Sequence, residues 1–332
     1  MAREIAEIPT IAQRVLTRQE NMAAIAAAIE QAAPRMVVLC GRGSSGHVGV
    51  YLRYLFEARY GVLVSSSAPS VITTYRRPPD MRETLFIVIS QSGRSPDLIV
   101  ATQTARSLGA LTLALVNDED SPVARAAHWV FPLEAGPERA VAATKTVVLS
   151  MLAGAQLVAT LARDDDLMHA LQRMPERLAR ALACDWSAWA DSLAGAPAAF
   201  VVGRGYGLGS VREIALKVTE TLQLPVLGYS AAELRHGPRA AISAATPVLV
   251  LTQSDEAAAT TDSLVRDLRE TGNRVFSAGS LESTLPWLEP DQPVCDPIAM
   301  LMPAYRAVEA AARKAGLDPD NPPHLNKVTR TL

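Results

Sequence analysis

Several residue types that mark particular functions are scarce in this chain. It holds three cysteines, an odd number at wide spacing (Cys40, Cys184 and Cys295), which argues against a disulfide framework. Its five histidines show none of the paired spacing that zinc sites use, so we predict no metal centre and no other cofactor. A net charge of −2 without a Lys/Arg stripe argues against a nucleic-acid partner.

Segments that would enter a membrane are also lacking. Residues 1–7 carry charge where a signal peptide needs an apolar core. The longest uncharged run lies between Lys145 and Arg163, contains Ser150 and Gln156, and falls just short of the length of a membrane span. We therefore predict a buried helix there and a cytoplasmic, soluble protein without a membrane partner.

The chain contains an internal repeat. Its 332 residues, 49% of them apolar, suffice for two domains with separate cores. Gly41-Arg42-Gly43 recurs as Gly203-Arg204-Gly205, and Ser90-Gln91-Ser92 recurs as Thr252-Gln253-Ser254. The two offsets are equal, since 203 − 41 and 253 − 91 both give 162. Two motifs at one offset indicate a duplicated domain.

Each copy alternates apolar runs with helical patterns. The predicted strands are 36–40, 62–64, 85–89 and 111–116 in the first copy, and 200–202 and 248–251 in the second. This alternation is typical of parallel sheets with right-handed crossover helices, so the predicted fold class is α/β, doubly wound and flavodoxin-like, in two tandem domains. The predicted boundaries are a helical arm at 1–28, a first domain at 29–165, linker helices at 166–190, a second domain at 191–323 and a tail at 324–332.

Two turns of the first copy are rich in glycine and serine. One holds Ser44 and Ser45, and the other holds Ser90, Gln91, Ser92 and Ser95. Both follow strands, where a doubly wound sheet binds its ligand, and Pro96 starts a helix after the second turn. A helix N-terminus with free N–H groups attracts phosphate. Serines and glycines also form ordinary turns and caps, but two such turns at one sheet edge favour an anion site.

The second copy departs from this chemistry. Asp255 occupies the position of Gly93, and a carboxylate there suits a phosphate poorly. The first copy is therefore predicted to hold the anion and the second to be its structural partner. Gly41 to Gly46 matches the dinucleotide fingerprint, but no acidic residue ends the next predicted strand, so we do not predict a dinucleotide.

Charged residues gather in two places of the second copy. Glu213, Lys217 and Glu220 are spaced by four and three residues, which places them on one face of a helix. That spacing alone is typical of a solvated ion-pair ladder, but the intervening residues are apolar. His236 lies in the segment Glu-Leu-Arg-His-Gly-Pro at 233–238 and is equally compatible with a general acid/base or a turn histidine.

These segments, taken in order, resemble the sugar isomerase (SIS) domain family. More narrowly, they are similar to the isomerase half of glucosamine-6-phosphate synthase and to free-standing amino-sugar-phosphate deaminases. The resemblance runs from residues 4–9 through 89–93, 135–145, 213–220 and 231–238 to the tail at 320–327. The 233–238 segment followed by the tail lysine is its most specific part.

The resemblance implies a role for each candidate residue. It implies that Ser44, Ser45, Ser90, Gln91, Ser92 and Ser95 hold the sugar phosphate, and that Val141 and Ala142 line the sugar through backbone atoms. It further implies that Glu220 shuttles a proton between C1 and C2, flanked by Lys217 and Glu213. By the same resemblance His236 assists ring opening from the neighbouring subunit of a homodimer, and Lys327 approaches the carbonyl end of the open-chain sugar.

Some positions depart from the synthase pattern. Ala143 replaces a hydroxyl residue, Thr219 replaces a lysine, and residues 94–97 are closer to the deaminases. Because residue 2 is Ala2, with no nucleophilic cysteine at the start, we expect no glutaminase domain and no ammonia from glutamine.

We therefore expect an amino-sugar-6-phosphate deaminase/isomerase, converting glucosamine 6-phosphate to fructose 6-phosphate and ammonia. The alternatives are a fructosamine-6-phosphate deglycase, an isomerase that never touches nitrogen, and, in another class, a sugar-phosphate sensor without turnover. The sequence does not choose between gluco and galacto substrates.

Overall fold

The computed structural model describes residues 1–328, which form two compact units, each around one parallel sheet. The first-sheet unit comprises Thr10–Glu138, Lys145–Gln172 and the tail from Asn326, and the second-sheet unit comprises Met1–Pro9, Arg139–Thr144 and Arg173–Leu325. The units interleave along the chain. At two of the points where the chain passes from one unit to the other, it does so inside a helix, α1 (Ala2–Leu16) or α8 (Asp165–Leu182). The linear boundaries predicted from the sequence remain a prediction.

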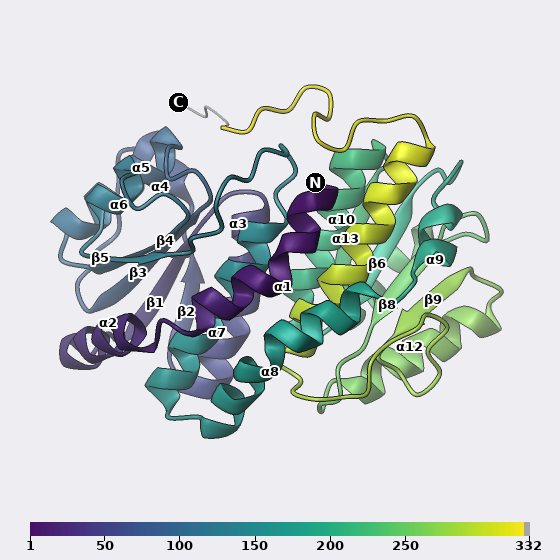
Figure 1. Ribbon diagram of the computed structural model, residues 1–332, viewed down its shortest axis with the longest axis horizontal. Coiled ribbons are helices and arrows are strands. Elements are labelled where there is room, and N and C mark those ends of the chain that lie inside the picture. The colour runs from purple at the N-terminus through teal and green to yellow at the C-terminus, as the bar shows by residue number, and fades with distance from the viewer. Residues whose placement is uncertain (329–332) are drawn as a thin grey trace. The chain divides into compact units, whose positions relative to one another are not determined.

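Five parallel strands form the sheet of the first-sheet unit, in the order β2-β1-β3-β4-β5 (Figure 1). They are β1 (Met36–Cys40), β2 (Leu63–Ser66), β3 (Thr84–Ser90), β4 (Leu111–Val116) and β5 (Trp129–Pro132). The helices of this unit are α2 (Gln19–Ala32), α3 (Ser44–Leu55) with a π-helical turn at Phe56–Tyr60, α4 (Pro69–Thr73), α5 (Pro96–Ser107), α6 (Pro122–Ala126) and α7 (Lys145–Ala162).

Both faces of this sheet are covered, and its central strands are nearly continuous apolar runs, as expected for strands buried on both faces. On one face Phe86 and Val88 pack against Leu98 of α5 and Val123 of α6. On the other face α3 and α7 approach closely, since a Cβ at Gly154 would lie 2.3 Å from the Leu52 side chain.

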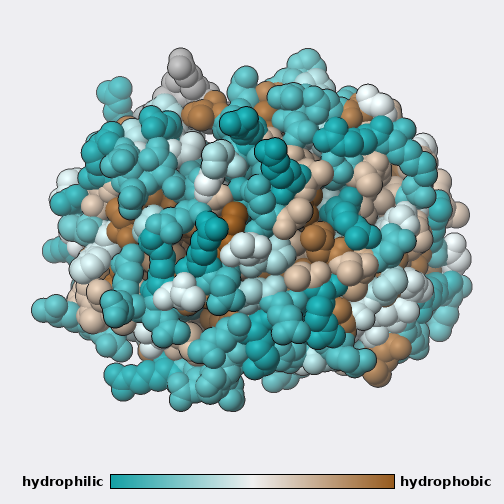
Figure 2. Space-filling view, viewed as in Figure 1, coloured by the Kyte–Doolittle hydropathy of each residue, from teal (hydrophilic) through white to brown (hydrophobic). Residues whose placement is uncertain are grey.

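Helix α7 is the one helix among residues 1–328 that is long and apolar enough to cross a membrane by composition. In the structure 89% of it is buried inside the protein, which confirms the predicted buried helix. The face of the molecule drawn in Figure 2 is mainly hydrophilic, with apolar residues in small groups.

Four parallel strands form the sheet of the second-sheet unit, in the order β7-β6-β8-β9. Helices α10 and α13 lie side by side, and Figure 1 shows α12 apart from them, beyond β8 and β9. The strands are β6 (Ala199–Gly203), β7 (Val226–Ser230), β8 (Val248–Leu251) and β9 (Val275–Ala278). The helices are α9 (Ser187–Ser192), α10 (Leu208–Leu222), α11 (Ala231–Arg235), α12 (Ala258–Glu270) and α13 (Asp296–Lys314), with short 3-10 turns at Gly205–Gly207 and Pro238–Ala241.

The first turn of α1 also belongs to the second-sheet unit. The Glu4 carboxylate accepts a hydrogen bond from the Ala140 N–H at 3.3 Å. The N–H of Val141 in turn donates to the Asp320 carbonyl at 2.9 Å. Three stretches far apart in sequence therefore meet in this unit.

The structure confirms the predicted fold class. The first sheet has the flavodoxin-like order 2-1-3-4-5, and the second has the same order without a fifth strand. Helices α5 and α12 begin at Pro96 and Ala258, which are again 258 − 96 = 162 residues apart. The predicted strand at 62–64 lies instead at Leu63–Ser66, because β2 pairs with β1 from Leu63 onwards.

Candidate active site

The two serine-rich turns of the first-sheet unit leave from neighbouring strands. The strand order reverses between β1 and β3, and this switch point is where doubly wound sheets bind ligands. An ion pair connects the turns directly: Arg42, after β1, contacts Asp97 in the first turn of α5, with Nε and Oδ2 2.8 Å apart. The predicted convergence of the two turns at one sheet edge is therefore confirmed.

Several groups at this edge are available to an anion. Ser44, Ser45 and Ser95 are half-buried, and their hydroxyls make no hydrogen bond to any described residue. Ser90 and Ser92 shape the turn, because their hydroxyls accept hydrogen bonds from the Gly93 N–H at 3.0 Å and the Arg94 N–H at 3.2 Å. Gln91 lies half-buried between them.

Gly93 is the one position of this turn that requires glycine. Its φ is +62°, in the left-handed region that other residues rarely adopt. A Cβ there would lie 2.1 Å from Ser121 Oγ, so the turn and the loop before α6 pack too closely for any side chain. Asp255, the matching residue of the second copy, excludes the same geometry.

The matching turn of the second-sheet unit is closed by its own side chains. The Gln253 amide donates to the Arg204 carbonyl at 2.6 Å and to the Asp255 carboxylate at 3.2 Å. Asp255 accepts from the Ala257 N–H at 2.9 Å, which occupies a donor that an anion would use. Burial raises the pKa of Asp255, because the charged carboxylate is poorly hydrated there.

The charged residues of α10 form one cluster in the second-sheet unit. The side chain of Lys217 is 1% exposed and that of Glu213 is fully buried, with Nζ and Oε1 3.5 Å apart. Lys217 also donates to Glu220, whose side chain keeps 19% of its surface exposed. The structure therefore excludes the solvated ladder, since the lysine is buried and Glu220 alone of the three meets solvent.

Tyr305 completes this cluster and was not identifiable from local sequence patterns. Its hydroxyl, on α13, donates to Glu213 Oε1 at 3.2 Å inside the protein. The contact joins residues 92 apart, and a single tyrosine in an apolar helix gives no local signal. Tyr305 orients Glu213, which in turn holds Lys217.

The remaining candidates are distributed over both units. In the first-sheet unit Lys327 pairs with Glu138, with Nζ and Oε2 3.4 Å apart, and the buried Glu138 also accepts from the Thr146 hydroxyl at 2.8 Å. In the second-sheet unit Ala142 is buried, and the N–H of Val141 is occupied by Asp320, which leaves its carbonyl for a ligand.

His236 stands apart from the α10 cluster. It is exposed at the end of α11, where Ser230 caps the helix by accepting from the Glu233 N–H. No contact among the described residues joins His236 to Lys217 or Glu220.

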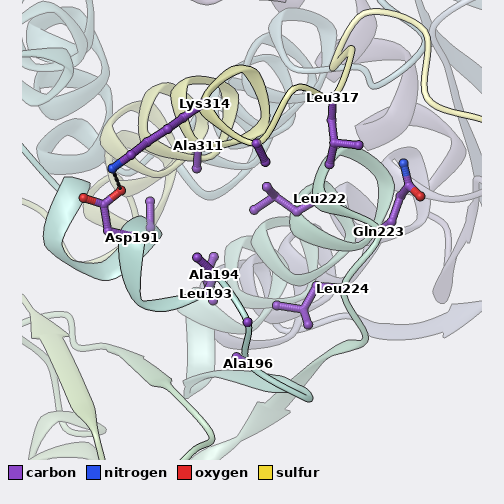
Figure 3. A pocket seen from close by; sticks show the side chains of 13 residues that line it. Asp191, Leu193, Ala194, Ala196, Leu222, Gln223, Leu224, Ala311, Lys314 and Leu317 are labelled. Atoms are coloured by element: carbon purple, nitrogen blue, oxygen red, sulfur yellow. Dashed lines mark hydrogen bonds and ion pairs between the residues drawn. The ribbon is translucent and has the colours of Figure 1, made fainter.

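A pocket of about 590 Å³ in the second-sheet unit is unsuited to a sugar phosphate. Figure 3 shows Leu193, Leu222 and Leu224 in its lining and an ion pair between Lys314 and Asp191, whose atoms are 2.8 Å apart. The only charged groups in its lining thus neutralise each other, and the C-terminal ends of α10 and α13 disfavour anions. Within residues 1–328, no three His, Cys, Asp or Glu side chains gather where a metal ion could bind.

Comparisons with known proteins identify relatives over nearly the whole chain. The model of the SIS domain family matches residues 31–160 and 192–277. The glutamine–fructose-6-phosphate aminotransferase [isomerizing] of Methanothermobacter thermautotrophicus is 32% identical, over 98% of this chain and 56% of the relative. The chain thus spans about half the length of the curated relatives it matches.

Solved structures share the fold. A candidate phosphosugar isomerase from Silicibacter pomeroyi DSS-3 is 38% identical, with a TM-score of 0.91 over 96% of this chain and 98% of that one. The glucosamine-6-phosphate deaminase of Thermotoga maritima is 21% identical, with a TM-score of 0.79 over 99% of both chains. At that identity the second likeness shows a common fold.

Proposed function

Because this chain belongs to the SIS domain family, we propose that it is a phosphosugar isomerase of the deaminating kind. The proposed reaction converts glucosamine 6-phosphate and water to fructose 6-phosphate and ammonia. The observation that carries the proposal is the α10 cluster, in which a buried lysine lies beside a carboxylate that solvent can reach. Relatives named as isomerising aminotransferases and as a deaminase support it.

The cluster has the groups that the chemistry needs. In the open-chain sugar, the Glu220 carboxylate removes the proton from C2, and electrons move through C1 to give an enolamine. Glu220 then returns a proton to C1, which leaves an imine at C2. Water hydrolyses that imine to the ketone and ammonia. The charge of Lys217 stabilises the negative charge that develops on the oxygen attached to C1 of the sugar, and it keeps Glu220 oriented.

The serine-rich turns of the first-sheet unit have a separate role in this proposal. The free hydroxyls of Ser44, Ser45 and Ser95 and the N-terminal turn of α5 bind the 6-phosphate. The carboxylate of Asp97 lies in that same turn, but Arg42 neutralises it at 2.8 Å. Val141, Ala142 and Lys327 are proposed to contact the sugar, as the family resemblance implies.

The first experiment measures ammonia released from a panel of phosphorylated amino sugars. Glu220→Gln keeps the size of the side chain but cannot accept a proton, so kcat should fall by about 10²–10⁴-fold while KM changes little. Glu270→Gln is the matched control, because Glu270 is exposed at the end of α12 and makes no hydrogen bond or ion pair with a described residue. Near-normal kcat in Glu220→Gln would show that another group is the base.

The same panel separates the alternatives. Ammonia from glucosamine 6-phosphate supports the deaminase, whereas turnover of fructosamine 6-phosphates alone identifies a deglycase. Aldose–ketose exchange without ammonia identifies a simple isomerase, and binding without turnover identifies a sensor. In D₂O the deaminase should place deuterium at C1 of the fructose 6-phosphate, because the Glu220 proton exchanges with solvent.

We also propose a cytoplasmic homodimer in which His236 serves the neighbouring subunit's site as the acid that opens the sugar ring. Its exposure and its separation from the α10 cluster within one chain support this. Mixing inactive Glu220→Gln with inactive His236→Ala should restore activity in hybrid dimers. With subunit exchange verified, absence of complementation would place His236 outside the partner's site.

A further inference from the structure

A polar pocket lies at the switch point of the second sheet. Its volume is about 430 Å³, within the range of small-molecule sites. The lining begins with Arg204, directly after β6, and continues with residues of α11 and α12, which follow β7 and β8. The strand order reverses between β6 and β8, so the pocket occupies the place where this fold binds ligands.

The charge of this pocket is entirely positive or neutral. Its lining residues are Arg204, Ala232, Arg235, His236, Ala259, Thr260 and Ser263, with no carboxylate among them. Arg235 is held by Asp267, outside the lining, at 2.7 Å, and donates to the Ser263 hydroxyl at 3.1 Å. The hydroxyl of Thr260 makes no hydrogen bond to a described residue.

The internal repeat explains why Arg204 is available. Arg204 matches Arg42, since 204 − 42 is 162, and Arg42 is paired with Asp97 on the second residue of α5. The second residue of α12 is Ala259, because 97 + 162 is 259. The arginine is therefore retained while its carboxylate partner is replaced by alanine, and no described residue forms an ion pair with Arg204.

Asp255, on the adjoining turn, does not replace that partner. Both oxygens of Asp255 accept hydrogen bonds, one from the Ala257 N–H and one from the Gln253 amide. The Asp255 carboxylate and the Arg204 guanidinium form no ion pair with each other. A half-buried guanidinium thus faces a pocket that contains two hydroxyls and a second arginine.

We propose that this pocket is a second anion site, which binds a phosphate monoester through the Arg204 guanidinium and the hydroxyls of Thr260 and Ser263. Its phosphate ligands are separate from the serine-rich turns of the first-sheet unit, and binding does not depend on the proposed reaction; His236 lines the pocket but is not one of these ligands. Two alanines and no large apolar side chain line it, so the ligand is hydrophilic, as free phosphate or a sugar phosphate is.

Calorimetric titration of the full chain tests the proposal with three probes: inorganic phosphate, fructose 6-phosphate and unphosphorylated fructose. Arg204→Gln should weaken one phosphate-binding event at least about tenfold, because it removes a charge-assisted hydrogen bond. Arg212→Gln is the matched control, since Arg212 is exposed on α10 and does not line the pocket. It changes net charge equally and should leave that event unaltered.

Ala259→Asp provides a second variant that keeps Arg204 in place. It restores the carboxylate of the first copy, so it should neutralise the guanidinium and abolish the same event. Ser92→Ala should instead affect only the other site. Equal affinity for both phosphates indicates recognition of the phosphate alone, and tighter binding of fructose 6-phosphate indicates a sugar phosphate. Both results support the site.

Three results would overturn it. The first is a titration that shows only one phosphate-binding event, with an affinity that neither Arg204→Gln nor Ala259→Asp changes. Another is equal weakening by Arg204→Gln and Arg212→Gln, which indicates a general charge effect. The third is binding of fructose as tight as that of its phosphate. His236 is left unaltered in every variant because it is a candidate catalytic residue.

Discussion

Lys217→Met should destabilise the protein far more than loss of an exposed ion pair. The substitution keeps the length of the side chain but leaves Glu213 charged and fully buried. Coulomb's law at the 3.5 Å separation and an effective dielectric constant of about 20 gives about 5 kcal/mol for the lost attraction. Breaking a buried pair costs about 3–5 kcal/mol in other proteins, so we expect a loss in that range.

The chain provides a matched control at the same helical spacing. Arg53 on α3 and Glu57 in the π-helical turn that continues it are also four residues apart, with Nε and Oε1 3.2 Å from each other, but their side chains are 55% and 32% exposed. Arg53→Met should therefore cost no more than about 1 kcal/mol. Adding Glu213→Gln to Lys217→Met should recover most of the lost stability, because it removes the unpaired buried charge. The glutamine side chain can still accept the hydrogen bond from the Tyr305 hydroxyl.

Urea titrations followed by circular dichroism give the free energy of unfolding of each variant. The reasoning fails if Lys217→Met and Arg53→Met cost the same, or if the double variant is no more stable than Lys217→Met. Either result would mean that Glu213 is hydrated or protonated once the lysine is absent.

Two further predictions concern the two matching turns. Ser92→Ala in the first-sheet unit should raise KM for the phosphorylated sugar about tenfold or more, because Ser92 shapes the turn proposed to bind the phosphate. Steady-state kinetics measure this KM, and an unchanged value would exclude the turn as the phosphate-binding site. Asp255→Asn should gain stability relative to the wild type as pH rises above about 4, the ordinary pKa of an aspartate carboxyl group. Because burial raises the pKa of Asp255 in the folded state, wild-type stability falls as pH rises through that pKa, and asparagine removes this loss. A melting-temperature difference that does not vary with pH would contradict this.

Buried runs were the most predictable part of the fold. Strands β1 and β8 lie at the residues predicted for them, because each is an uninterrupted apolar run covered on both faces. An apolar-run criterion misses β7, an edge strand in which Leu227 is 50% exposed and Gly228 interrupts the pattern. Its position depends on pairing with β6, which no local pattern specifies.

The candidate site was also only partly predictable from the sequence. Helical spacing predicts that Glu213, Lys217 and Glu220 share a face, and the structure shows them in contact. Burial of Lys217 and its support by Tyr305 could not be predicted, because they arise from the packing of α13 against α10. The repeat offset matches Arg204 to Arg42 in the sequence. That Arg204 has no carboxylate partner, because Ala259 stands where Asp97 does, could be recognised only from the Arg42–Asp97 ion pair in the structure.

The order in which the second-sheet unit can assemble follows from its three separated stretches. During synthesis, Glu4 emerges well before its partner at Ala140, and Val141 emerges well before Asp320. The first turn of α1 must therefore stay without the Glu4 contact while the ribosome makes the next 136 residues. Large loops must also close before these contacts form, which predicts slow folding for this unit. Residues 10–138, in contrast, already contain every strand of the first sheet, so that sheet can form while the second is still being made.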